Sequence, residues 1–110
     1  MNQKKVFKVG LGKKKFIVKD YLICDNFISK ARGLMFRGKN FSTPLLFVFS
    51  KPGRYAIHSF FCRKFIAVWM LKGRITDVTL VEPWRFAVTP KEKFDGLLEI
   101  PFPATKKRNI

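Results

Sequence analysis

Basic side chains are the most abundant chemically active groups in this sequence. Its 110 residues include 23 Lys and Arg but only 7 Asp and Glu, for a formal net charge of +16 at pH 7. Such an excess opposes compaction by self-repulsion, so an anionic partner is its simplest explanation. Nucleic acid is the commonest such partner, and an anionic membrane surface comes second. A bias toward solubility or thermal stability is the alternative, although that bias usually adds acids as well.

The positive residues fall into three main clusters that phosphate groups could contact: the N-terminal lysines, a group after residue 31, and a C-terminal group. The predicted nucleic-acid-binding residues are Lys4, Lys5, Lys8, Lys13, Lys14, Lys15, Lys19, Arg32, Arg37, Lys39, Arg63, Lys64, Trp84, Arg85, Lys106, Lys107 and Arg108. Lysine supplies a mobile charge that binds phosphate without base specificity. Trp84 and Phe86 flank Arg85 and could stack on an unpaired base, with core packing as the alternative.

Candidate catalytic pairs are weak by comparison. His58 and Cys62 are four residues apart, which on a helix would permit a thiolate–imidazole pair. On the strand expected here they share a face but lie about 13 Å apart, which favours a structural histidine.

The carboxylates form no close pair either. Asp77 and Glu82 point to opposite faces of a continuous strand, and Asp95 and Glu99 lie about 13 Å apart along theirs. No phosphate-binding loop, dinucleotide fingerprint, zinc-protease motif or nucleophile elbow is present. The single histidine and two cysteines cannot complete a zinc site without carboxylates. We therefore expect no enzymatic activity, no metal and no cofactor.

The stretch from Leu45 to Val81 provides the elements that must position these groups. Its apolar runs at residues 45–49 and 65–71, with the mixed segment 54–62 between them, are bounded by Pro52-Gly53 and Lys72-Gly73. This pattern is typical of buried strands joined by tight turns. Residues 65–71 include no polar side chain, so both faces of that strand should be covered. Lys72-Gly73 is predicted to form a two-residue hairpin turn.

The flanking segments complete one domain over residues 1–110. Residues 1–19 are predicted to form a basic hairpin or arm, with Gly10 and Gly12 in its turn, and residues 21–24 to extend its second strand. A short helix is expected near residues 26–36, a last strand over residues 94–100 with Gly96 at a bulge, and a basic tail over residues 102–110. The predicted fold is all-β and mainly antiparallel, a jelly-roll-like β-sandwich or open barrel with one short helix.

The sequence also favours a cytoplasmic protein with reduced thiols, although a Cys24–Cys62 disulfide is an alternative. Lysines interrupt any apolar region of a secretory signal near the N-terminus. The longest apolar run has seven residues, which is too short to span a membrane.

Several motifs resemble a known family in their order along the chain. Residues 30–37, KARGLMFR, look like the "ER-x-GLM-x-R" signature of the family catalogued as domain of unknown function 192. Residues 46–49, 56–61, 73–75, 82–84 and 97–101 are similar to further segments of that family. The likeness covers about residues 16–101, and it implies a small β-sandwich of jelly-roll type whose activity is not established.

Two departures from this family direct the functional hypothesis. Members usually carry an Asp where this chain has Ala67, and the lysine-rich N-terminus and basic tail are not family features. We therefore expect a family scaffold that lost a site and gained charge. The leading hypothesis is a ribosome- or ribonucleoprotein-associated protein that binds structured RNA, such as rRNA, or other nucleic acid and contacts neighbouring proteins. The alternatives are a small-ligand-binding or enzymatic domain, and a module that binds an acidic protein or lipid.

Overall fold

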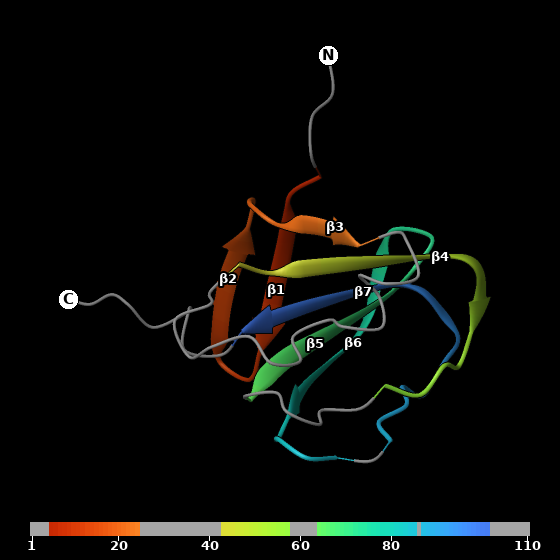
Figure 1. The fold of residues 1–110 in the computed structure, drawn as a ribbon. Helices are drawn as coiled ribbons and strands as arrows, with labels where there is room; N and C mark the ends of the chain where they lie inside the picture. Colours follow the sequence, from red (N-terminus) through yellow and green to blue (C-terminus); the bar gives the residue numbers. More distant parts are fainter. Residues whose placement is uncertain (1–4, 25–42, 58–63, 86, 102–110) are drawn as a thin grey trace.

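The computed structural model describes residues 5–24, 43–57, 64–85 and 87–101, and these residues form an all-β structure (Figure 1). The strands are β1 (Phe7–Leu11), β2 (Lys14–Val18), β3 (Leu22–Cys24), β4 (Leu45–Gly53), β5 (Phe65–Leu71), β6 (Arg74–Val81) and β7 (Phe94–Pro101). The predicted all-β class is thereby confirmed. The helix expected near residues 26–36 and the tail at residues 102–110 lie outside the described residues.

Strands β1 and β2 form the predicted basic hairpin as a separate two-stranded antiparallel sheet. The turn uses Gly12 with a φ of 62° at its first central position, which a glycine adopts without steric cost. Gly10 is not part of the turn, contrary to the prediction. It lies within β1 opposite Lys15 because the alternating pattern continues to Leu11.

The second sheet has five strands in the order β3-β4-β7-β5-β6. The prediction that residues 21–24 extend the hairpin was wrong. The chain leaves the hairpin at Tyr21, and β3 pairs in parallel with the start of β4, with Leu22 opposite Leu45. The other pairings in this sheet are antiparallel.

Two other expectations about the central stretch were also wrong. Pro52-Gly53 does not form a turn after a short strand, because β4 continues to Gly53 through a register shift against β7 that begins after Val48. Residues 54–56 are outside the strands, and Ile57 makes only an isolated bridge with Val88. The predicted bulge at Gly96 is also displaced. The register shifts between the Val48–Gly96 and Gly53–Phe94 pairs, and the extra residues of this shift lie in β4 and not in β7.

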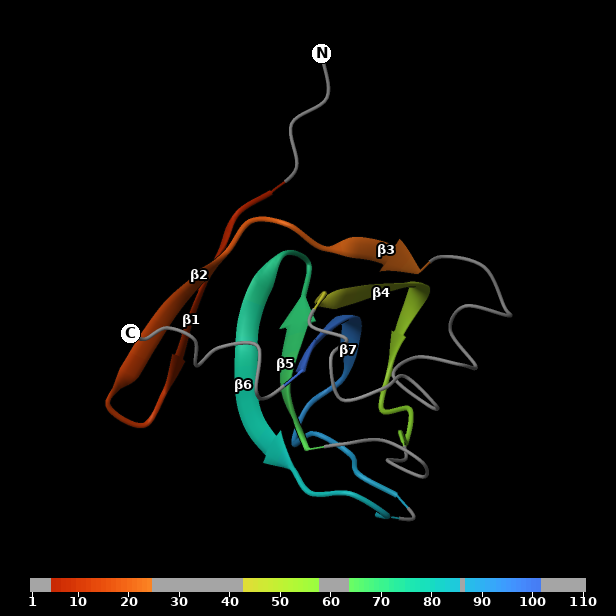
Figure 2. The ribbon, with the colours of Figure 1, turned by 60° about the vertical axis from the view of Figure 1, so that its left-hand side comes forward.

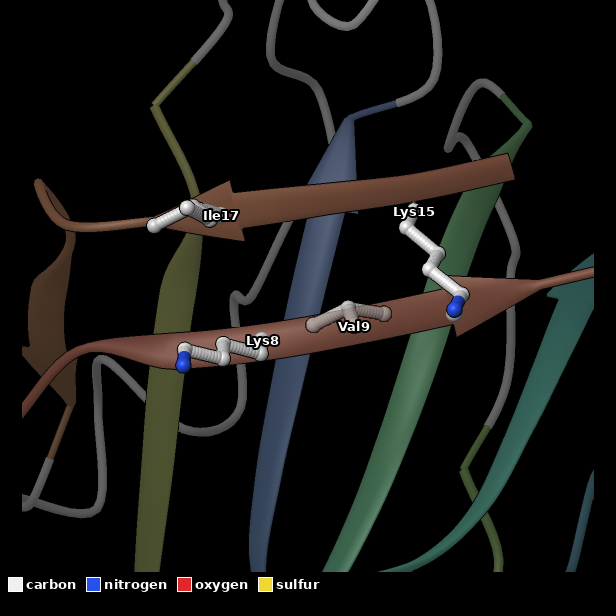
Figure 3. Close-up of a pocket in the computed structure, with 5 residues that line it drawn as sticks. Lys8, Val9, Lys15 and Ile17 are labelled. Carbon is white, nitrogen blue, oxygen red and sulfur yellow. The ribbon is translucent and has the colours of Figure 1, made fainter.

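Strand β5 is buried on both faces, as its wholly apolar sequence predicted. Its even-numbered side chains Ile66, Val68 and Met70 pack in one apolar layer with Val9 and Val18 of the hairpin. Figures 2 and 3 show how the hairpin covers this side of the sheet; in Figure 3 it crosses β4, β7 and β5 at a steep angle. Two sheets with an apolar layer between them match the predicted sandwich or open barrel.

The opposite face of the five-stranded sheet carries a second apolar layer. Odd-numbered residues of β5, including Trp69, pack there with Phe47 and Leu97. The Trp69 ring meets Phe94 edge to face with ring centroids 4.8 Å apart, and Phe49 joins this aromatic group through Phe94 at 5.5 Å. Apolar layers therefore cover both faces of the sheet.

The β5–β6 turn confirms the predicted two-residue hairpin. Lys72 and Gly73 have φ values of 50° and 83°, which is the pattern of a type I′ turn. The backbone N–H of Lys72 donates a hydrogen bond to Asp95 Oδ1 at 3.0 Å, which ties the turn to the beginning of β7.

Candidate nucleic-acid interface

The β1–β2 hairpin presents a basic face to solvent. Because alternate residues of a strand share a face, Phe7, Val9 and Val18 point inward and are buried. Their neighbours form the outer face of the hairpin, which we define by Lys8, Gly10, Lys15 and Ile17. Cross-strand register places Lys8 opposite Ile17 and Gly10 opposite Lys15, so one lysine occupies each pair.

The lysine-rich sequence therefore becomes a surface with positive charge on both strands. The described lysines of this segment are all exposed: Lys5, Lys8, Lys13, Lys14, Lys15 and Lys19. No acidic residue occurs between positions 5 and 19, so no carboxylate within this segment neutralises them. The local potential is consequently positive over the hairpin and its turn.

A groove of about 440 Å³ lies on this outer face, lined by Lys8, Val9, Gly10, Lys15 and Ile17. Figure 3 shows Lys8 on β1 and Lys15 reaching from β2 toward β1, with their amino groups at opposite ends of the groove. Ile17 is 58% exposed, although it is a large aliphatic residue. The groove therefore combines an apolar floor with two flanking cations.

Lys5 has a structural contact that distinguishes it from the other hairpin lysines. Its Nζ donates a hydrogen bond to the Gly73 carbonyl at 2.6 Å and lies 5.7 Å from the centroid of the Phe7 ring. The carbonyl of Lys5 accepts a hydrogen bond from Tyr21 Oη at 2.7 Å. These contacts fix the start of the hairpin against the β5–β6 turn.

The remaining predicted residues that the structure describes lie elsewhere. Lys64 is half-buried immediately before β5, and Arg85 is exposed in the connection after β6. Trp84 is 57% exposed with a φ of 64°, so the core-packing alternative for this ring was wrong. The structure does not bring Trp84 and Arg85 to the outer face of the hairpin, since both ribbon views place their connection beyond the end of β6 (Figures 1 and 2).

Several predicted residues lie outside the described part of the chain: Lys4, Arg32, Arg37, Lys39, Arg63, Lys106, Lys107 and Arg108. The same holds for His58 and Cys62, and for the flanking ring of Phe86. The described residues do add positive charge beside Lys5, because Lys72 and Arg74 are exposed at the β5–β6 turn. Arg54, by contrast, donates two hydrogen bonds to the Pro90 carbonyl, at 3.0 and 2.9 Å, and acts as a loop clamp.

Two of the carboxylates accept hydrogen bonds from backbone N–H groups. Asp77 Oδ1 accepts a hydrogen bond from the Val78 N–H, and Asp95 is engaged by Lys72 at the turn. No group of three or more His, Cys, Asp and Glu side chains capable of holding a metal ion occurs within the described residues.

Glu99 is the exception that pair-by-pair sequence reasoning missed. It lies in the central strand β7 between Leu45 of β4 and Ala67 of β5, and it is only 7% exposed. Burial raises the pKa of its carboxyl to about 8, because the charged form is poorly solvated. A lone acid in the apolar run LLEIP was the sequence signal that could have identified it.

Trp69 provides a second unusual polar group on the same face of the sheet. Its Nε1 is buried without a hydrogen-bond partner among the described residues. Residues 67 and 69 share a face of β5, and Ala67 is directly opposite Glu99, so both polar groups belong to this layer. Buried polar groups of this kind are uncommon and carry a desolvation cost.

Comparison with known proteins assigns the family. The chain is 33% identical over 81 residues to UPF0127 protein PH1112 of Pyrococcus horikoshii, covering 72% of this chain and 70% of the relative. It is 36% identical to UPF0127 protein PYRAB11210 of Pyrococcus abyssi, covering 72% and 68%, and 37% identical to UPF0127 protein PF1050 of Pyrococcus furiosus, covering 70% and 67%. The protein belongs to the UPF0127 family. No protein-family model matches the chain.

Solved structures with the same fold carry little sequence likeness. A protein of unknown function from Novosphingobium aromaticivorans has a TM-score of 0.69 at 15% identity, over 86% of this chain and 70% of that one. A candidate transcription regulator from Sinorhizobium meliloti also has a TM-score of 0.69, at 14% identity, over 86% and 77%. These likenesses support the fold. The sequence relatives carry the UPF0127 name, which agrees with the expectation of a family whose activity is not established.

Within the described residues, no helix is long and apolar enough to cross a membrane.

Proposed function

We propose that this protein binds nucleic acid, with structured RNA such as ribosomal RNA as its target, through the phosphate backbone. In this proposal it is a non-enzymatic cytoplasmic component of a ribonucleoprotein and contacts neighbouring proteins there. The observation that carries the proposal is the exposed hairpin, with six described lysines and no acid between positions 5 and 19. Lysine ammonium groups bind phosphate as mobile point charges, and release of counterions then drives binding.

The family resemblance fits the same proposal. Within the UPF0127 family, the chain would be a divergent member of domain of unknown function 192, with Ala67 at the position of the usual Asp. Such a member would use the family scaffold to present a basic surface. The rigid two-layer core supports this role, because the hairpin is held on the sheet by Val9, Val18 and their partners.

The test is binding of a structured RNA across a salt series. We expect the logarithm of the association constant to fall steeply and linearly with the logarithm of the salt concentration. The double variant Lys8→Ala/Lys15→Ala should reduce the magnitude of this slope by about 1.5, since each phosphate contact contributes roughly 0.7–0.9.

The matched control is Lys51→Ala/Lys91→Ala, which removes the same charge from two exposed positions outside the hairpin, one in β4 and one in the connection ahead of β7. This control should keep nearly the full slope. Undetectable binding by the unmodified protein, or a binding constant insensitive to salt, would refute the proposal.

Glu99 favours a second candidate function, small-ligand binding or acid–base chemistry in the layer that contains Trp69. A carboxyl with a pKa near 8 is protonated at neutral pH and can donate or accept a hydrogen bond. Glu99→Gln separates the two functions. It should leave RNA affinity unchanged if the hairpin is the RNA-binding surface, whereas it should change small-ligand binding or turnover if the buried layer is a functional site.

A further inference from the structure

The groove on the hairpin has a composition that pure charge binding does not require. Ile17 is 58% exposed beside its cross-strand partner Lys8, and Gly10 leaves the position opposite Lys15 without a side chain. A surface that recognised phosphate alone would gain nothing from an open aliphatic floor. An occupant that used both features of the groove would offer an uncharged face as well as anionic groups.

The spacing of charge around the floor defines that occupant further. Cross-strand register places Lys8 beside Ile17 at one end of the groove and Lys15 beside Gly10 at the other, and Figure 3 shows the two ammonium groups well separated along the hairpin. Successive phosphates of an unpaired nucleic acid strand bracket a base that is free to turn toward the protein. In a duplex the bases are stacked on one another, so only phosphates and groove edges are available.

We infer that this groove accepts a single-stranded segment of RNA, with one base on the Ile17–Gly10 floor and the flanking phosphates on Lys8 and Lys15. The inference rests on the proposed function and specifies its substrate class. Among the described residues that line the groove, only the two lysines carry hydrogen-bonding side chains, so the contact is aliphatic and should discriminate little among bases. A groove of about 440 Å³ falls in the size range of small-ligand sites, roughly 300–1,000 Å³.

Gly10 offers a way to fill the groove without changing the charge. A Cβ at this position would have only the Lys14 carbonyl oxygen within 4 Å, at 3.9 Å, and the backbone there is not left-handed. Valine also favours strands, so Gly10→Val should fold. Ile17→Thr provides a second variant, which keeps a β-branched side chain but removes apolar surface from the floor.

The experiment measures the binding of two RNAs of equal charge, a single-stranded oligouridine and a duplex. Each RNA is tested against the unmodified protein, Gly10→Val and Ile17→Thr. Thermal melting of each variant checks that it is folded. We expect both variants to weaken oligouridine binding roughly fivefold to tenfold, as partial loss of one aliphatic contact would. Their affinity for the duplex should change less than about twofold, because every lysine remains.

Each other outcome overturns a specific statement. Absence of binding to either RNA refutes the proposed function itself. Equal binding of both RNAs, or unchanged oligouridine affinity in folded variants, refutes the groove and leaves charge-based binding standing. Tighter binding to anionic phosphatidylserine vesicles than to oligouridine, with loss of vesicle binding in Ile17→Thr, would assign the groove to a lipid surface instead.

Discussion

Replacement of Glu99 by Gln tests whether this buried carboxyl is protonated in the folded protein. Glu99 is 7% exposed in the central strand, and burial raises its pKa from 4.5 to about 8. The amide keeps the shape of the side chain and can reproduce the hydrogen-bonding capacity of the neutral acid. It cannot ionise, so the difference between the two proteins isolates the titration of this one group.

The direction of the effect follows from proton binding in the two states. Between about pH 4.5 and pH 8 the unfolded chain has released the proton of Glu99, whereas the folded protein still holds it. The contribution of the protonated Glu99 carboxyl to the stability of the fold is therefore fully present below pH 4.5 and is lost as the pH rises toward 8. The cost of keeping Glu99 in the fold reaches about 3 kcal/mol at pH 7 and about 5 kcal/mol well above pH 8.

Urea unfolding of both proteins at about pH 5, 7 and 9 measures this cost. We expect Glu99→Gln to be more stable than the unmodified protein by a margin that grows with pH. Glu92→Gln is the matched control, since Glu92 is exposed in the connection ahead of β7 and its replacement removes a carboxyl that is not buried.

A direct readout is the carboxyl chemical shift of Glu99 followed by NMR. The reasoning would be refuted if this carboxyl titrated near its ordinary value, or if the stability margin between the two proteins were the same at every pH. Either result would mean that the charged form is solvated within the fold.

Two further substitutions test the packing that positions these groups. Gly73→Ala should destabilise the fold by about 1–2 kcal/mol in thermal unfolding, because Gly73 has a φ of 83° and an added Cβ would lie 2.9 Å from Lys5 Nζ; an unchanged melting temperature would show that this end of the hairpin can shift freely. Ala67→Asp should cost roughly 3–5 kcal/mol near pH 8, because it buries a second carboxyl directly opposite Glu99; Glu99→Gln should recover part of that loss, and equal losses in both backgrounds would show that the two carboxyls do not interact.

Local sequence signals predicted the hairpins well. The run from Phe65 to Leu71, the Lys72-Gly73 turn and the basic β1–β2 hairpin follow from apolar patterning and turn chemistry, which act over a few residues. The sequence did not reveal that Tyr21 leads into a separate strand, since β3 pairs with β4 about 20 residues further along the chain. Nor did it show that β4 continues through Pro52, because a register shift at this position depends on the partner strand.

The sequence by itself determined the charge of this protein and the alternation that turns lysines outward on the hairpin, because both are properties of neighbouring residues. Only the tertiary structure decided that Gly10 leaves a groove between Lys8 and Lys15 and that Glu99 is buried beside Ala67. Both depend on cross-strand register: the pairing of β1 with β2 sets the groove, and the pairing of β5 with β7 brings Ala67 and Glu99 together although they are distant in the chain. The same lysines in a different register would bind phosphate equally well and form no groove.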